Sequence, residues 1–167
     1  MENSINLKRR TFLRGTLATG AVIAAASAGL LRAGQVLAAE WPAAAFQATK
    51  LDEAMKAALG STEIKNGPVQ IKAPTIAENG AVVPVTVTTD SPMTADNYVS
   101  DIYIFVDNNP SPLIASFHLT PMSGKADVST RIKMGKTSKV RAVVKTNKGE
   151  MFQAANEVKV TIGGCGG

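Results

Sequence analysis

The feature that most constrains the fold is a series of short runs rich in Val, Ile, Thr and aromatic residues, which begins at Val69. Clusters of Gly, Pro, Asn and Asp separate these runs, and this pattern is typical of strands joined by tight turns. About seven or eight such strands in about 100 residues is the number found in an immunoglobulin-like β-sandwich. The sequence therefore predicts a mainly β fold of that kind. The likeness concerns architecture only, because a chain with one cysteine lacks the cysteine pair that bridges the sheets of many immunoglobulin domains.

Individual runs predict how their strands are buried. Val83, Val85 and Val87 alternate with polar residues and with Pro84, which predicts a half-buried strand at an edge or a bulge. Residues 102–106 are apolar on both faces, which predicts a central strand whose second face is covered by a helix or a partner. Turns are expected at 108–110 and 147–149, and the other strands are expected over 113–119, 128–132, 139–146, 150–156 and 157–161.

One amphipathic helix is predicted ahead of the strands, between Glu40 and Leu59. Apolar residues recur there at spacings of three and four, as they do on one face of a helix. Trp41-Pro42 precedes the periodic residues and Gly60 follows them, and these residue types commonly flank helices. The expected folded domain, residues 39–162, is thus a short helix followed by a β-sandwich.

Residues 1–38 have the pattern of a removable export signal. Arg9 and Arg10 form a twin arginine followed by Phe12 and Leu13, and the stretch 15–31 is mildly apolar and rich in Ala and Gly. A transmembrane anchor is the alternative, but the stretch is shorter than the about 20 apolar residues that span a bilayer. A small-residue cleavage pattern ends at Ala38. The sequence therefore predicts twin-arginine export to the bacterial periplasm, with no membrane anchor.

The basic character of the chain belongs largely to this signal. The formal net charge is +5, but cutting after Ala38 removes five of the 18 basic residues and one of the 13 acidic ones, so that 13 and 12 remain. The remaining lysines are scattered singly and form no basic stripe that could neutralise phosphates. Nucleic-acid binding is therefore not expected.

Residue counts and missing motifs exclude most catalytic and metal sites. With one His and one Cys, the chain cannot build a zinc site of Cys and His ligands, a haem attachment motif or an intrachain disulfide. Motifs for nucleotide binding, nucleophilic serines and zinc proteases are absent. His118 alternates with Ile114 and Ser116, so we interpret it as an ordinary surface or partly packed residue. Met93 and Met134 have no second soft ligand at a suitable spacing for copper. The sequence predicts no catalytic residue, metal or cofactor.

The most informative segment is the end of the chain, Gly163-Gly164-Cys165-Gly166-Gly167, which follows the last expected strand. Glycine has wide backbone freedom and no side chain, so residues 163–167 are predicted to form a flexible arm with an accessible thiol. An ordinary disordered tail would leave a spare thiol in an oxidising compartment unexplained. The arm contains no His, helix N-terminus or cation that could activate a catalytic cysteine. Such a thiol is suited to carrying a covalently bound group into the active sites of other proteins.

The twin-arginine signal, the helix, the sandwich and the terminal Val-Lys-Val-Thr-Ile-Gly-Gly-Cys-Gly-Gly together resemble the SoxY family of bacterial sulfur-oxidation (Sox) systems. The resemblance covers essentially the whole chain and is most specific at the glycine-flanked cysteine. It implies a non-enzymatic carrier that forms a heterodimer with a SoxZ-like subunit. It also implies that sulfur intermediates are held covalently on Cys165, and that the flanking glycines form its swivel: Gly163, Gly164, Gly166 and Gly167.

The resemblance further implies a cycle of partner enzymes. A haem-containing enzyme joins thiosulfate oxidatively to Cys165, and a hydrolase then releases sulfate. In some organisms a sulfane dehydrogenase containing molybdenum oxidises the remaining sulfur before a second hydrolysis. The partner surface is expected at residues 102–106 and on the Ile114 side of the next strand, because both are apolar.

Two alternatives belong to other classes of protein. A structural or adhesion-like periplasmic sandwich would form a permanent dimer through a disulfide between the Cys165 residues of two copies. A copper-delivery protein would need soft ligands beside Cys165, and the tail contains none.

Overall fold

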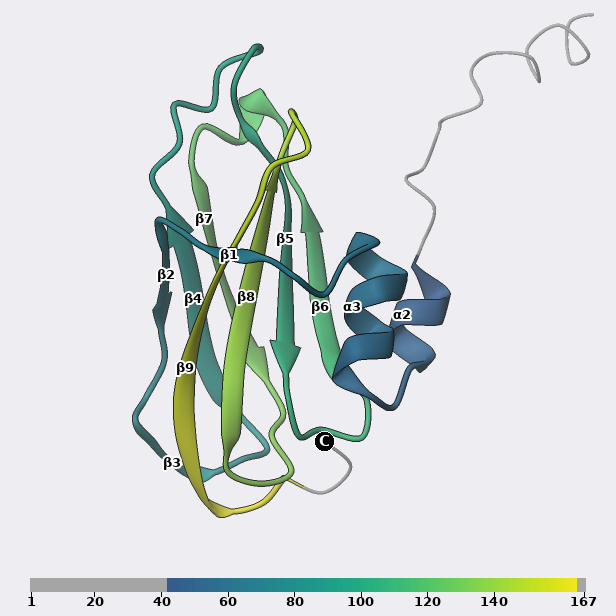
Figure 1. Cartoon of the computed structure of the whole chain (residues 1–167). Coiled ribbons are helices and arrows are strands. Elements are labelled where there is room, and N and C mark those ends of the chain that lie inside the picture. Colours follow the sequence, from purple (N-terminus) through teal and green to yellow (C-terminus); the bar gives the residue numbers. More distant parts are fainter. Residues whose placement is uncertain (1–41, 165–167) are drawn as a thin grey trace, which may run out of the picture. The chain divides into compact units, whose positions relative to one another are not determined.

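The computed structural model describes residues 42–164, which contain two short α-helices, one 3-10 helix and nine strands in two sheets (Figure 1). Their order is α2 (Ala43–Gln47), α3 (Leu51–Leu59), β1 (Lys65–Asn66), β2 (Val69–Lys72), β3 (Ile76–Asn79), β4 (Val83–Thr89), β5 (Val99–Val106), β6 (Leu113–His118), η1 (Pro121–Ser123), β7 (Ala126–Ile132), β8 (Ser138–Thr146) and β9 (Met151–Ile162). The predicted mainly β fold is confirmed. No helix between residues 42 and 164 is long and apolar enough to cross a membrane.

The larger sheet is organised around β9. Its strands lie in the order β1-β9-β8-β5-β6, and β3 also pairs with β9. β8 runs antiparallel to β9, whereas β1 pairs parallel with it near its beginning and β3 pairs parallel with it near its end. β9 therefore makes pairing contacts along its whole length.

β9 is a single strand of 12 residues, where the sequence predicts two strands over 150–156 and 157–161. The expected boundary falls at Asn156 and Glu157, but both residues pair with β8. The Nδ2 atom of Asn156 donates a hydrogen bond to the carbonyl oxygen of Ile71 at 2.8 Å. This polar side chain thus finds a partner within the strand, and no turn is needed there.

The predicted turn between β8 and β9 is confirmed. Gly149 has a φ of +84°, a left-handed conformation that glycine adopts without steric cost. Its N–H donates to the carbonyl oxygen of Thr146 at 2.9 Å, which closes the hairpin.

The smaller sheet places β4 between β2 and β7, with antiparallel pairing on both sides. Val83, Val85 and Val87 are all buried, as their alternation predicts. The prediction that Pro84 places this strand at an edge or a bulge is wrong, because β4 is the middle strand of the smaller sheet and Pro84 lies opposite Arg131 of β7 in a continuous register. Proline is tolerated there because β2 pairs only with residues 86–89, so the other side of β4 is unpaired at Pro84.

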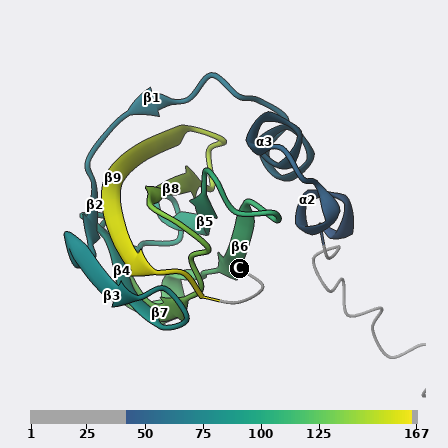
Figure 2. The ribbon, with the colours of Figure 1, turned by 90° about the horizontal axis from the view of Figure 1, so that it is seen from below.

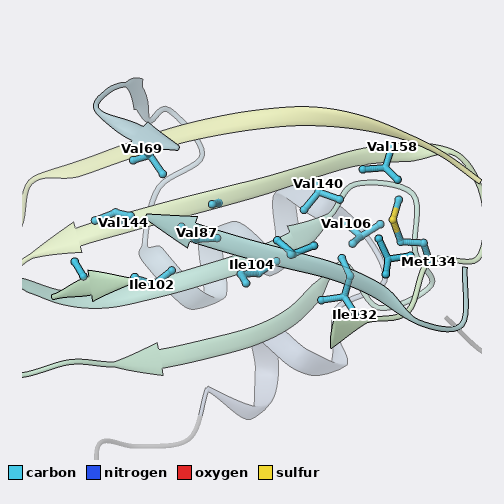
Figure 3. Close-up of a cluster of buried hydrophobic side chains, with 14 of the residues drawn as sticks. Val69, Val87, Ile102, Ile104, Val106, Ile132, Met134, Val140, Val144 and Val158 are labelled. Carbon is cyan, nitrogen blue, oxygen red and sulfur yellow. The ribbon is translucent and has the colours of Figure 1, made fainter. Parts of the chain in front are cut away.

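The two sheets enclose the main hydrophobic core (Figure 3). Val87 and Ile132 of the smaller sheet contribute to it from one side, and Ile104 of the larger sheet contributes from the other. Met134, in the connection between β7 and β8, is fully buried, and Met93 is 5% exposed. Both methionines therefore serve as core residues.

The second face of the larger sheet is covered by α2 and α3 (Figure 2). The sequence predicts one helix, but the chain is extended at Ala48 (ψ 139°) and Lys50 (ψ 142°), which divides the segment into two. The division lets Ala45 of α2 and Met55 of α3 join the same buried cluster as Phe105. The prediction that Gly60 ends the helical segment is confirmed, because Gly60 caps α3 with a φ of +76°.

Residues 102–106 of β5 are buried on both faces by the protein itself. Tyr103 and Phe105 lie under the helices, whereas Ile102 and Ile104 lie in the core between the sheets. Burial, and to a lesser extent the charge of Asp101, raises the pKa of Tyr103. The predicted central strand is therefore confirmed, and the prediction that it forms a partner surface is wrong.

Candidate functional site at the end of β9

The predicted site residues divide between the described part of the chain and the rest. The thiol-bearing tail and the export signal lie outside the described residues, and this set comprises Cys165, Gly166, Gly167, Arg9, Arg10, Phe12 and Leu13. Gly163 and Gly164 are described, and they join β9 to Cys165. The contacts that Gly163 and Gly164 make with other segments therefore define the described part of the candidate site.

Two connections from elsewhere in the chain reach the end of β9 (Figure 1). Asn79, the last residue of β3, lies opposite Ile162, so the β3–β4 turn begins at this point. Ser138, the first residue of β8, lies opposite Val158, so the β7–β8 loop ends close by. Both connections therefore approach Gly163 and Gly164.

A series of backbone hydrogen bonds holds Gly164 to both connections. The Gly80 N–H donates to the carbonyl oxygen of Ile162 at 2.7 Å, and the Met134 N–H donates to the carbonyl oxygen of Gly80 at 2.7 Å. The Gly164 N–H in turn donates to the carbonyl oxygen of Met134 at 3.0 Å. These distances are those of well-formed N–H···O bonds. We call the residues around this network the glycine clamp: Gly80, Met134, Gly135, Gly163 and Gly164.

The backbones of the glycine clamp approach too closely to admit side chains at three positions. A Cβ atom on Gly164 would lie 2.7 Å from backbone atoms of the β3–β4 turn. One on Gly163 would lie 2.2 Å from the carbonyl oxygen of Gly135, and one on Gly80 would lie 2.1 Å from that of Met134. The predicted flexibility of Gly163 and Gly164 stays a prediction, but the described structure gives both residues a second role. These two glycines allow close packing of backbones.

Asn109 connects the β5–β6 turn to the loop that carries Met134 and Gly135. Its side chain is 3% exposed. Its Nδ2 atom donates to the carbonyl oxygen of Lys133 at 2.8 Å, and its Oδ1 atom accepts the N–H of Gly135 at 3.1 Å. The sequence identifies Asn109 only as a turn residue, because nothing near it in the chain indicates which loop it will hold.

Replacing Asn109 with alanine is expected to lower the free energy of unfolding by about 1–3 kcal/mol, because the substitution removes a buried side chain and two part-buried hydrogen bonds to the backbone. Equilibrium urea denaturation measures this difference. Asn108→Ala is the matched control, since Asn108 is exposed and its loss should change the free energy by less than about 0.5 kcal/mol. Equal losses in the two variants would contradict the role assigned to Asn109.

His118, the only histidine, lies at the other end of the larger sheet. It is on β6 opposite Asp101, with which it forms an ion pair when protonated, and its side chain is 47% exposed. Asp101 lies opposite Lys145, which lies opposite Met151 at the start of β9. Met151 thus marks the end of β9 that lies across the sheet from His118. The 12 residues of β9 rise about 3.3 Å each, so roughly 36 Å of strand separates Met151 from Ile162. His118 is therefore a surface residue remote from the glycine clamp.

The described part of the site offers fixed backbone rather than acid–base or metal-binding groups. Residues 42–164 contain no group of three or more His, Cys, Asp and Glu side chains placed to hold a metal ion. What the glycine clamp can do is position the chain immediately before Cys165.

A family model described as "Sulfur oxidation protein SoxY" matches residues 55–165, a span that includes the glycine clamp and Cys165. The chain belongs to the SoxY family. The resemblance inferred from the terminal motif is thereby confirmed, and SoxY membership gives the protein a carrier role in sulfur oxidation.

Solved structures agree with this assignment. The sulfur carrier protein SoxY from Chlorobium limicola f thiosulfatophilum is 46% identical, and the alignment covers 68% of this chain and 97% of that one with a TM-score of 0.57. Two variants of the superoxide reductase (neelaredoxin) from Ignicoccus hospitalis are 21% and 20% identical, cover 66% and 67% of this chain and 92% and 89% of theirs, and have TM-scores of 0.51. At these identities they share only the fold with this SoxY chain. No curated protein sequence matches it.

Proposed function

We propose that this SoxY protein is a periplasmic carrier that holds thiosulfate-derived sulfur covalently on Cys165 and presents it to the enzymes of the oxidation pathway. The observation that carries the proposal is the family match, which extends as far as Cys165. Cys165 is the only cysteine of the chain, so it is the only thiol that can form such a bond. It directly follows Gly164, which is held at the end of β9.

The proposed chemistry begins with oxidative loading. The thiol of Cys165 and thiosulfate form a new S–S bond with loss of one proton and two electrons, and a haem-containing loading enzyme accepts the electrons. Hydrolysis then transfers the terminal sulfonate to water as sulfate and leaves a persulfide on Cys165. Where a sulfane dehydrogenase is present, water supplies three oxygen atoms to the outer sulfur, six electrons are removed, and a second hydrolysis restores the thiol.

Each of these proposed reaction steps requires a partner protein. SoxY membership implies a Sox system with a SoxZ partner. The loading enzyme, the sulfate-releasing hydrolase and the sulfane dehydrogenase are proposed as visiting enzymes, because the described residues place no histidine near the end of β9 to activate the thiol.

The proposed location is the periplasm, reached through the twin-arginine signal around Arg9 and Arg10. In that oxidising compartment a lone cysteine has no partner within its own chain. Covalent attachment of sulfur explains the presence of this cysteine, whereas a structural role does not.

The decisive measurement is the intact mass of the protein purified from thiosulfate-grown cells, with and without reductant. We expect species heavier than the free thiol form by one thiosulfate unit or by one sulfur atom, and reductant should remove both additions. Protein alkylated at Cys165 before exposure to the loading enzyme and thiosulfate is the control, and it should gain nothing. A reducible species at twice the chain mass, with no sulfur addition, would support the alternative of a disulfide-linked dimer and contradict the carrier function.

A further inference from the structure

An asparagine is followed by a glycine at two places in the chain, Asn66-Gly67 and Asn79-Gly80. The backbone nitrogen of such a glycine can attack the side-chain amide carbon of the asparagine, because glycine has no side chain to obstruct the approach. Both asparagine side chains are exposed, so exposure does not distinguish them. Any large difference in reactivity between the two pairs must therefore come from how the fold holds each backbone.

The pair Asn79-Gly80 is held by three hydrogen bonds. The Oδ1 atom of Asn79 accepts the N–H of Ala81 at 2.8 Å, which fixes the side chain. The Gly80 N–H donates to the carbonyl oxygen of Ile162 at 2.7 Å, and the Gly80 carbonyl oxygen accepts the Met134 N–H at 2.7 Å. Gly80 is also buried. The nitrogen that would attack and the amide that it would attack are thus both engaged elsewhere.

The pair Asn66-Gly67 is held more weakly. β1 has two residues and lies at the end of the larger sheet, where it pairs only with β9. The Gly67 N–H donates to the carbonyl oxygen of Gln153 at 3.3 Å, which is longer than the usual N–H···O distance. The Asn66 side chain makes no hydrogen bond or ion pair within the described part of the chain. A short edge strand opens locally at a lower free energy than the core strands, so this nitrogen and this amide can meet.

We propose that Asn66 is a site of spontaneous deamidation in the folded protein, and that the fold protects Asn79 from the same reaction. The Gly67 nitrogen bonds to Cγ of Asn66, and ammonia leaves with the proton of that nitrogen, which closes a five-membered succinimide ring. Water then opens the ring at either carbonyl group and leaves aspartate or isoaspartate. No electrons are transferred and water is the only co-reactant. The inference does not depend on the proposed carrier function.

The modified residue would lie where the helical segment is attached to the larger sheet. Asn66 lies opposite Gln153. The Nε2 atom of Gln153 donates to the carbonyl oxygen of Ile64 at 2.7 Å, and its Oε1 atom accepts Nη1 of Arg141 at 2.7 Å. Ile64 belongs to the buried cluster under α2 and α3. Isoaspartate adds one atom to the main chain, so β1 loses its register with β9. Deamidation should therefore loosen the connection between α3 and the sandwich.

The two pairs within one chain allow an internal comparison. The whole protein is incubated in mildly alkaline buffer, and peptide mapping by mass spectrometry measures conversion at each asparagine, with isoaspartyl methyltransferase to label the isoaspartate. In the folded protein we expect Asn66 to convert at least about tenfold faster than Asn79. In urea the two rates should agree within about threefold, because both pairs are then equally free. Equal rates in the folded protein, or no conversion of Asn66 in the folded protein, would overturn the proposal.

Two variants separate the site from its structural effect. Asn66→Gln should abolish conversion at this position, because its longer side chain disfavours the five-membered ring. Asn66→Asp is the matched control for the product, since it has the charge of aspartate without the longer main chain of isoaspartate. Hydrogen exchange of the β1 amides should accelerate at least about tenfold in the isolated isoaspartyl protein and stay near that of the wild type in Asn66→Asp. Equal acceleration in both proteins would contradict the loss of register. Gly67→Ala is unsuitable, because its Cβ atom would lie 2.5 Å from the side chain of Phe152.

Discussion

Replacing Cys165 with serine is expected to abolish covalent sulfur loading completely, while the free energy of unfolding changes by less than about 0.5 kcal/mol. A serine hydroxyl cannot form the S–S bond that loading requires, and the chain has no second cysteine to take over. A residue between glycines near a chain end is expected to bury little surface, so the substitution should leave the core intact. Intact mass after incubation with thiosulfate and the loading enzyme measures the first effect, and urea denaturation measures the second.

Two outcomes would contradict this expectation. A sulfur adduct on the Cys165→Ser protein would show that another group carries the load. A loss of several kcal/mol in the free energy of unfolding would show that the cysteine is packed in the fold. Wild-type protein with an alkylated thiol is the control, because it blocks the same atom without changing the sequence.

Replacing both Arg9 and Arg10 with lysine is expected to reduce the mature protein in the periplasm at least about tenfold and to leave an unprocessed precursor in the cytoplasm. The twin-arginine pathway depends on the paired guanidinium groups, and lysine keeps the charge but not the planar donor geometry. Cell fractionation followed by immunoblotting and mass measurement of the precursor gives the result.

Arg14→Lys is the matched control for export, because Arg14 lies in the same segment but outside the pair. We expect this variant to be processed normally. Normal processing of the double variant as well would contradict the proposed export route and, with it, the periplasmic location.

The fold was predictable where the signal is local. The alternation of Val83, Val85 and Val87 gives the buried face of β4, because successive side chains of a strand point to opposite faces. The turn at Gly149 is equally local, since a left-handed residue between two strands favours glycine. The continuity of β9 through Asn156 was not predictable, because the hydrogen-bond partner of that side chain is the carbonyl group of Ile71, far away in the chain.

The candidate site was predictable as a sequence motif but not as a structure. Gly163 and Gly164 stand beside a lone cysteine, and flexibility is the simplest reason for glycines in that position. Their packing depends on Gly80 and Gly135, which meet them only after both sheets have formed. No local pattern distinguishes a glycine that frees the backbone from one that lets two backbones approach.

The parallel pairing of β1 and β3 with β9 has a consequence for folding kinetics. Lys65 lies opposite Phe152, and Ile76 lies opposite Lys159, so each pairing closes a loop of more than 80 residues. Contacts between such distant residues form slowly, because the chain loses the entropy of loop closure before the contacts contribute any favourable free energy. The hairpin of β8 and β9 should therefore form early, and the pairing with β3 that builds the end bearing Gly164 should form late. Gly163 and Gly164 would then reach their places beside the β3–β4 turn only in chains whose remaining sheets are already complete.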